Sequence, residues 1–173
     1  MKTYLNISII FLFLTSSSFG QDTEKMLKYY ESVGQQKSFL IENWGEPIKI
    51  EINDYGVTVY HYKIEKADFQ FSLCNQKVIG AILTLQPGQD DASSFTFYII
   101  LGVKLEKDGF EKTETTYDVK NVSIDGQTHN FVKEYEIKDQ FNKGDILIRM
   151  ELTRGDNYKL ILKSSAVINK VEM

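Results

Sequence analysis

The residues best suited to catalysis are few and lie far apart in the sequence. The chain has two histidines, His61 and His129, and one cysteine, Cys74. A nucleophilic site needs a histidine beside a serine or cysteine, and the sequence has no Gly-x-Ser-x-Gly turn that would present such a serine. We therefore interpret both histidines as structural residues of strands and Cys74 as a small buried apolar residue. We predict no catalytic residue, and the protein is interpreted as a non-enzyme.

Two groups of acidic residues resemble functional sites, but neither pattern is complete. Residues 139–145 match a calcium loop as far as its glycine, yet Phe141 and Lys143 occupy positions that need oxygen ligands. Asp90 and Asp91 precede a predicted helix, where carboxylates interact favourably with the helix dipole. Two histidines and one cysteine are too few ligands for a structural zinc. The sequence therefore predicts neither a metal nor a cofactor.

Composition and charge exclude several classes of protein. The 173 residues include 20 basic and 24 acidic side chains, which give a formal net charge of −4, and 42% of the residues are hydrophobic. Nucleic-acid binding needs clustered Lys and Arg that displace counterions from phosphates, so an acidic chain argues against that class of partner. The hydrophobic fraction is too high for a disordered chain, and the length suits one domain or two small halves.

Residues 1–20 are typical of a secretory signal peptide. A lysine precedes a short apolar stretch, and Ser18 and Gly20 place small side chains at the −3 and −1 positions of a cleavage before Gln21. The apolar stretch is shorter than the roughly 20 residues that cross a bilayer. We predict an exported protein of a bacterial envelope, periplasmic or extracellular, with no membrane span after cleavage.

Periodicity in the rest of the chain predicts helices followed by strands, in two successive rounds. In the first round Gly45 and Pro47 end the helical part. The first strand follows, and Ile48, Ile50 and Ile52 alternate with charged residues as expected for one buried face. The predicted elements are helices at 23–33 and 36–44, strands at 48–52, 57–64, 69–74 and 78–85, a helix at 93–108, and strands at 112–120, 131–138, 146–152 and 158–163.

The second round gives two specific predictions, the buried face of its helix and the register of its first hairpin. Helical spacing predicts that the helix buries one set of residues, namely Phe95, Tyr98, Ile99, Gly102 and Leu105. In the following hairpin, paired residues must share a face of the sheet, which predicts a three-residue loop with a bulge and places Val119 opposite Phe131.

These elements predict an α+β protein in which helices pack on antiparallel four-stranded meanders. The simplest arrangement is two αβ4 units in tandem, an N-terminal ααβ4 unit at 21–88 and a C-terminal αβ4 unit at 89–173, with a break in the Pro-Gly region near residue 88. A single closed barrel plugged by the helices is the alternative.

Three motifs of the first half resemble a known family. They are Trp44-Gly45-Glu46-Pro47, Tyr60-His61-Tyr62, and the stretch from Leu73 to Val78. Together they are similar to the small envelope module of BamE (SmpA/OmlA) proteins and of the β-lactamase inhibitor protein, which doubles the αβ4 unit. The resemblance covers about residues 23–85 and implies a scaffold that binds other proteins rather than a catalyst.

The function predicted from the sequence is that of an exported, non-enzymatic protein-binding module, either an inhibitor or an envelope assembly factor. The polar tips of Tyr60 and Tyr62 are the candidate contact residues. Two alternatives remain open. The many aromatic residues on strands also fit a carrier of an apolar or aromatic ligand, and an unfamiliar hydrolase would require a cleft where His61 or His129 meets an acidic group.

Overall fold

The computed structural model describes residues 21–85, 91–124, 127–154 and 160–168. The predicted signal peptide, including Gly20 at its cleavage site, and most of the predicted break near residue 88 lie outside these residues. The first half contains α2 (Gln21–Leu27), the 3₁₀ helix η1 (Tyr29–Ser32), α3 (Lys37–Trp44), β1 (Lys49–Ile52), β2 (Thr58–Ile64), β3 (Ala67–Cys74) and β4 (Lys77–Leu85). The second half contains α4 (Asp91–Lys107), β5 (Glu111–Ile124), β6 (Gln127–Lys143), β7 (Ile146–Arg154) and β8 (Leu160–Ile168).

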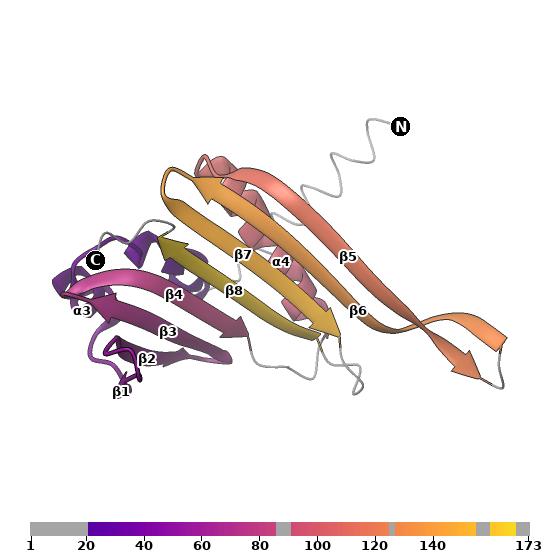
Figure 1. Ribbon diagram of the computed structural model, residues 1–173, viewed down its shortest axis with the longest axis horizontal. Helices are drawn as coiled ribbons and strands as arrows, with labels where there is room; N and C mark the ends of the chain where they lie inside the picture. The colour runs from indigo at the N-terminus through magenta and orange to yellow at the C-terminus, as the bar shows by residue number, and fades with distance from the viewer. Residues whose placement is uncertain (1–20, 86–90, 125–126, 155–159, 169–173) are drawn as a thin grey trace.

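The described strands form one eight-stranded antiparallel sheet in the order β1-β2-β3-β4-β8-β7-β6-β5 (Figure 1). The predicted fold class, an α+β protein in which helices pack on antiparallel four-stranded meanders, is therefore wrong, because one large sheet dominates the structure. The last strand, β8, returns to pair with β4 from Gly80↔Val167 to Leu85↔Leu162. Either meander alone would have left an edge of unpaired backbone groups at this point, and pairing the two edges satisfies both.

The helices cover one face of this sheet. Phe71, Ala81, Ala166 and Ile148 are successive partners across four strands, so their side chains lie on the same face, and all four are buried. On this face the Trp44 ring at the end of α3 lies 4.8 Å from the ring centroids of both Phe69 and Phe71. On the opposite face Gln70, Ile82, Ser165 and Arg149 are successive partners, so polar side chains predominate there.

Polar contacts position η1 between α3 and α4. Tyr29 is fully buried, and its hydroxyl lies 2.7 Å from the Ser164 hydroxyl on β8. Tyr30 donates a hydrogen bond to the carboxylate of Asp108, just after the end of α4. Lys104 of α4 donates to the same carboxylate at 2.5 Å. These contacts connect the N-terminal helices to both the sheet and the second-half helix.

The face that α4 turns toward the sheet differs from the predicted one. Tyr98 and Leu105 are buried as expected, but Phe95 and Ile99 are 44% and 41% exposed. Phe97 and Leu101 take their places in the core. The helix carries apolar residues on all sides, so helical spacing by itself does not determine which side is buried. Among the described residues, no helix is both long and apolar enough to cross a membrane.

The long β5–β6 hairpin also has a different register from the predicted one. Val119 pairs with Tyr135 rather than with Phe131, and Ile124 pairs with Gln127. The register shifts at bulges near Asn121, within the paired strands. The sequence instead predicts one bulge in the loop. The two strands continue beyond their neighbours as a twisted ribbon (Figure 1).

A single continuous sheet predicts that the two halves unfold together. Leu152→Ala removes a fully buried side chain from β7 in the second half, a change that costs about 2–5 kcal/mol in a protein core. Because Trp44 is the only tryptophan and packs on the strands of the first half, its fluorescence reports the other half. We expect the urea midpoint measured by Trp44 fluorescence to fall together with that measured by far-UV circular dichroism.

Lys163→Ala is the matched control, because this exposed residue lies on the adjacent strand β8. It should change the free energy of unfolding by no more than about 0.5 kcal/mol. A Trp44 transition that keeps the wild-type midpoint in Leu152→Ala would show that the halves unfold independently.

Candidate functional site

The two candidate tyrosines lie under the helix layer. Tyr60 and Tyr62 are each 4% exposed, and the Tyr62 hydroxyl donates to the Gly45 carbonyl at 3.1 Å. Burial raises the pKa of Tyr62 to about 12, so its hydroxyl stays protonated. The Lys37 ammonium lies 5.5 Å from the centroid of the Tyr60 ring. A binding role for these tyrosines stays a prediction, but both border the surface described next.

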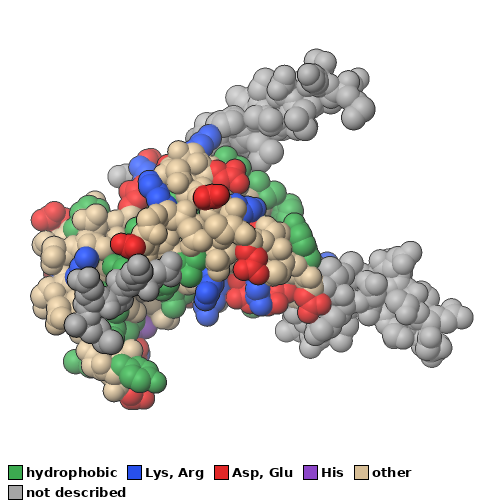
Figure 2. Space-filling model, turned by 45° about the horizontal axis from the view of Figure 1, so that its top comes forward, with side chains coloured by type: hydrophobic (Ala, Val, Ile, Leu, Met, Phe, Trp, Pro, Cys, Tyr) green, Lys and Arg blue, Asp and Glu red, His purple; other side chains and the backbone are tan. Residues whose placement is uncertain are grey.

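Large apolar side chains are exposed along β1 and at the residue that precedes it. Ile48, Ile50 and Ile52 are 70%, 55% and 73% exposed. Because Ile50 pairs with the buried Tyr60, Ile50 and Ile52 lie on the face of the sheet that helices cover elsewhere. We call these three residues the β1 surface. Figure 2 shows hydrophobic side chains at the surface of the lobe at lower left, where β1 lies.

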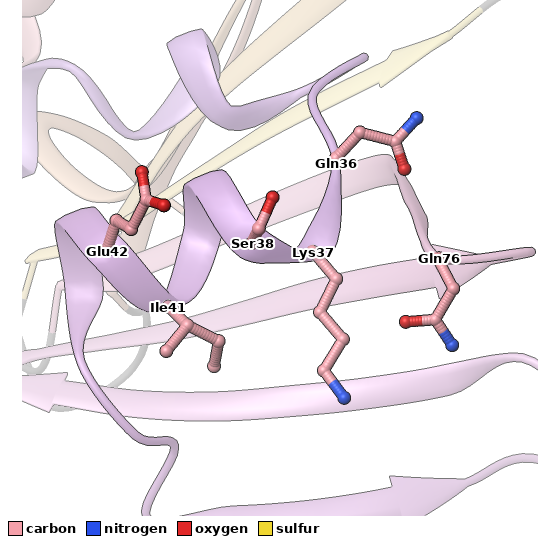
Figure 3. A pocket seen from close by; sticks show the side chains of 6 residues that line it. All are labelled: Gln36, Lys37, Ser38, Ile41, Glu42 and Gln76. Carbon is pink, nitrogen blue, oxygen red and sulfur yellow. The ribbon is translucent and has the colours of Figure 1, made fainter.

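An open cavity of about 530 Å³ lies beside α3. Its lining comes from α3 and the β3–β4 turn and comprises Gln36, Lys37, Ser38, Ile41, Glu42 and Gln76. In Figure 3, Lys37 and Ile41 point from α3 toward the strands. Lys37, one of the lining residues, lies over Tyr60, and Tyr60 pairs with Ile50 of β1. The arrangement offers an apolar strand surface and a recess beside α3.

The backbone of β1 is also available for pairing. Among the described strands, β1 pairs with β2 alone and forms one end of the sheet. The Asn53 amide donates to the Val57 carbonyl at 3.0 Å, in register with the β1–β2 pairs. Hydrogen-bonded pairs alternate along an antiparallel ladder, so the N–H and C=O groups of Ile50 and Ile52 point toward the free edge.

The other edge of the sheet has features that discourage strand pairing. The residues of β5 from Glu111 to Asp118 are all exposed, and charged or polar side chains lie on both faces. The β5–β6 register shifts between Lys112 and Glu114, which marks a bulge. Charges and bulges on an edge strand oppose the addition of another strand, whereas the four consecutive pairs of β1 contain no such irregularity.

On the opposite face of β1 lies a small exposed charge cluster that contains one of the two histidines. The Nε2 atom of His61 is 3.0 Å from Oε2 of Glu51, and Lys49 contacts the same carboxylate. The hydrogen bond from Lys49, together with His61, lowers the pKa of Glu51. A catalytic histidine would need a nucleophilic side chain within hydrogen-bond distance, whereas the His61 ring contacts the carboxylate of Glu51. The His129 side chain lies outside the described residues.

Asp139, the first residue of the calcium-like stretch, is buried under α4. It is 6% exposed and accepts hydrogen bonds from Tyr98 at 2.7 Å, Lys112 at 2.9 Å and Thr115 at 2.6 Å. Burial acts to raise the pKa of this carboxyl group, but the three donors outweigh it and the pKa is lowered. Asp139 therefore anchors α4 and β5 to β6. No cluster of three or more potential metal-ligating side chains occurs within the described part of the chain.

Sequence reasoning missed the β1 surface although its signal was visible. The alternation of isoleucines with charged residues correctly indicates a strand with one apolar face. It was interpreted as a buried face, because periodicity cannot show that the helix layer ends before the last strand.

Comparisons with known proteins give only distant structural likenesses. No protein family and no curated protein matches the sequence. A cysteine-rich secretory protein from Staphylococcus aureus subsp. aureus Mu50 aligns with 80% of this chain and 45% of its own, at 13% identity and a TM-score of 0.42. An extracellular protein containing an SCP domain from Bacillus anthracis str. Ames gives the same coverage and identity, with a TM-score of 0.43.

A third structure, a DUF4309 family protein from Bacillus subtilis subsp. subtilis str. 168, aligns over 84% of this chain and 95% of its own. The identity is 13% and the TM-score is 0.37. This chain spans less than half the length of the first two proteins. These scores mark a distant likeness.

The buried carboxylate predicts a specific pH dependence of stability. Because the folded-state pKa of Asp139 lies below the unfolded value of about 3.9, its stabilising effect is present above that pH and is lost as the pH falls through the folded pKa. We expect Asp139→Asn to lower the free energy of unfolding by about 1–3 kcal/mol at pH 7. The difference from wild type should narrow below about pH 4.

Urea denaturation at several pH values measures this effect. Asp145→Asn, in the exposed turn between β6 and β7, is the matched control and should show a small, uniform effect. A wild-type minus Asp139→Asn difference that stays constant between neutral and acidic pH would contradict the assignment.

Proposed function

We propose that the chain is an exported, non-enzymatic protein-binding module that binds an extended segment of a partner protein along the free edge of β1. The observation that supports this most directly is the coincidence of two features on one strand. Ile50 and Ile52 are largely exposed on the helix-covered face, and their backbone groups point to the open edge.

Strand addition uses both features at once. Backbone hydrogen bonds to an edge strand supply affinity without regard to sequence, and side chains on alternate positions supply specificity. A partner strand beside β1 would place every second side chain next to the isoleucines. The recess under Lys37 and Ile41 could then receive a side chain from that face. The partner segment is therefore an extended stretch with alternating apolar residues.

The two alternatives have weaker support in the structure. A carrier of apolar ligands would need an enclosed apolar cavity, whereas the cavity beside α3 is open. A hydrolase would need an acid and a histidine in a cleft, whereas the Glu51–His61 pair lies on an exposed part of the sheet.

Export is proposed from the N-terminal sequence, which has the order of charge, apolar stretch and small residues found in signal peptides. The similarity of residues 23–85 to the BamE-type module supports a place in a bacterial envelope. Within such a compartment the module would act either as an inhibitor or as an assembly factor, depending on the protein that supplies the strand.

A substitution at the centre of β1 tests the proposed binding edge. Ile50→Lys places a charge in the apolar row, and a lysine there opposes strand addition. Since Ile50 is 55% exposed, the free energy of unfolding should change by no more than about 0.5 kcal/mol. We expect proteins retained from an envelope or secreted fraction by immobilised wild type to be lost with Ile50→Lys.

Ile161→Lys is the matched control, because Ile161 is 40% exposed on β8, a strand paired on both sides. It should retain the same partner. Hydrogen exchange with the purified partner should then show protection of the Ile50 and Ile52 amides. Equal retention by Ile50→Lys and wild type, or no partner that protects these amides, would contradict the proposed edge.

A further inference from the structure

We infer that the segment that pairs with β1 is β1 of a second copy of this chain, so that two sheets join edge to edge in an antiparallel dimer. This inference rests on the proposed function, since it names the partner of the same edge. The strand is self-complementary: Ile50 and Ile52 lie on one face, and Lys49 and Glu51 lie on the other.

The register follows from placing a two-fold axis at Ile50. Ile50 then lies opposite Ile50 of the second copy. On the other face, Lys49 of each copy lies opposite Glu51 of its mate. Ile50 therefore meets an apolar residue and each charge meets an opposite charge, which are the pairings that stabilise antiparallel strands.

The backbone supports the same register. Since the N–H and C=O groups of Ile50 and Ile52 point to the free edge, Ile50 would form a hydrogen-bonded pair with its counterpart. Lys49 and Glu51 would then occupy non-hydrogen-bonded pairs, where facing side chains approach most closely.

The rest of the fold allows this arrangement. A two-fold axis perpendicular to the sheet keeps both helix layers on the same face, and α3 does not cover β1. The isoleucines of the two copies would then form one apolar floor between the two α3 helices. Closed two-fold pairing uses the same patch on both copies and leaves β5, the charged and bulged edge, at the outer ends.

Charge reversal distinguishes a second copy from any other partner. In Lys49→Glu or Glu51→Lys, both facing pairs of the dimer become like-charged, and we expect the dimer to weaken by about tenfold. In the double variant Lys49→Glu/Glu51→Lys the pairs are again opposite, and the dissociation constant should return to within about threefold of wild type. A different partner would keep its own charges and could not restore binding in this way.

Sedimentation equilibrium of the purified protein measures these constants. Concentrations up to about 0.5 mM are needed, because a single strand pair buries less area than a permanent dimer. Lys66→Glu, exposed in the β2–β3 turn, is the charge-matched control and should dimerise as wild type does. Thermal unfolding of each variant separates loss of pairing from loss of folding.

The outcomes separate this inference from the proposed function. A wild-type protein that stays monomeric throughout this range, or a double variant that does not recover, would overturn the second copy as the partner. If a heterologous protein is still retained and then lost with Ile50→Lys, the binding edge stands without self-pairing. If neither self-association nor Ile50-dependent retention is found, both proposals fail.

Discussion

The pairing of β4 with β8 determines most of the architecture. This contact joins two successive meanders into one sheet, and it buries Leu83 and Ser164 at its centre. Once these two strands pair, only β1 and β5 can be the edges of the sheet. The two edges then differ in chemistry: β5 has bulges and exposed charges, whereas β1 has a regular ladder and exposed isoleucines. The candidate site is thus a consequence of the pairing between β4 and β8, which leaves β1 as an edge strand.

The width of the helix layer is the second constraint. Trp44 at the end of α3 packs against Tyr62, Phe69 and Phe71, so α3 covers β2 and β3. The next strand outward has the same alternation but no helix above it, which leaves Ile50 half-exposed. An apolar row that continues past the covering layer is typical of a surface that another chain covers, since soluble proteins rarely expose such rows without use.

Buried polar groups make the helix positions specific. Tyr29 contacts Ser164, and Asp139 accepts hydrogen bonds from Tyr98, Lys112 and other donors. An unpaired polar group in the core would be costly, so each contact favours one placement of its helix over the sheet. These groups could be mistaken for functional sites on composition alone. Their complete hydrogen bonding shows that they stabilise the fold, and it leaves the exposed β1 edge as the candidate for binding.

The sequence by itself determined the local elements of this protein. Alternation located the strands, and Gly45 marked the end of α3, because both signals depend on neighbouring residues. Tertiary structure alone decided that the two meanders share a sheet, that Phe97 rather than Phe95 faces the core, and that Ile50 is left uncovered. Such outcomes depend on contacts between segments far apart in the chain. An isoleucine in a strand shows the same alternation with its sequence neighbours whether or not a helix covers it.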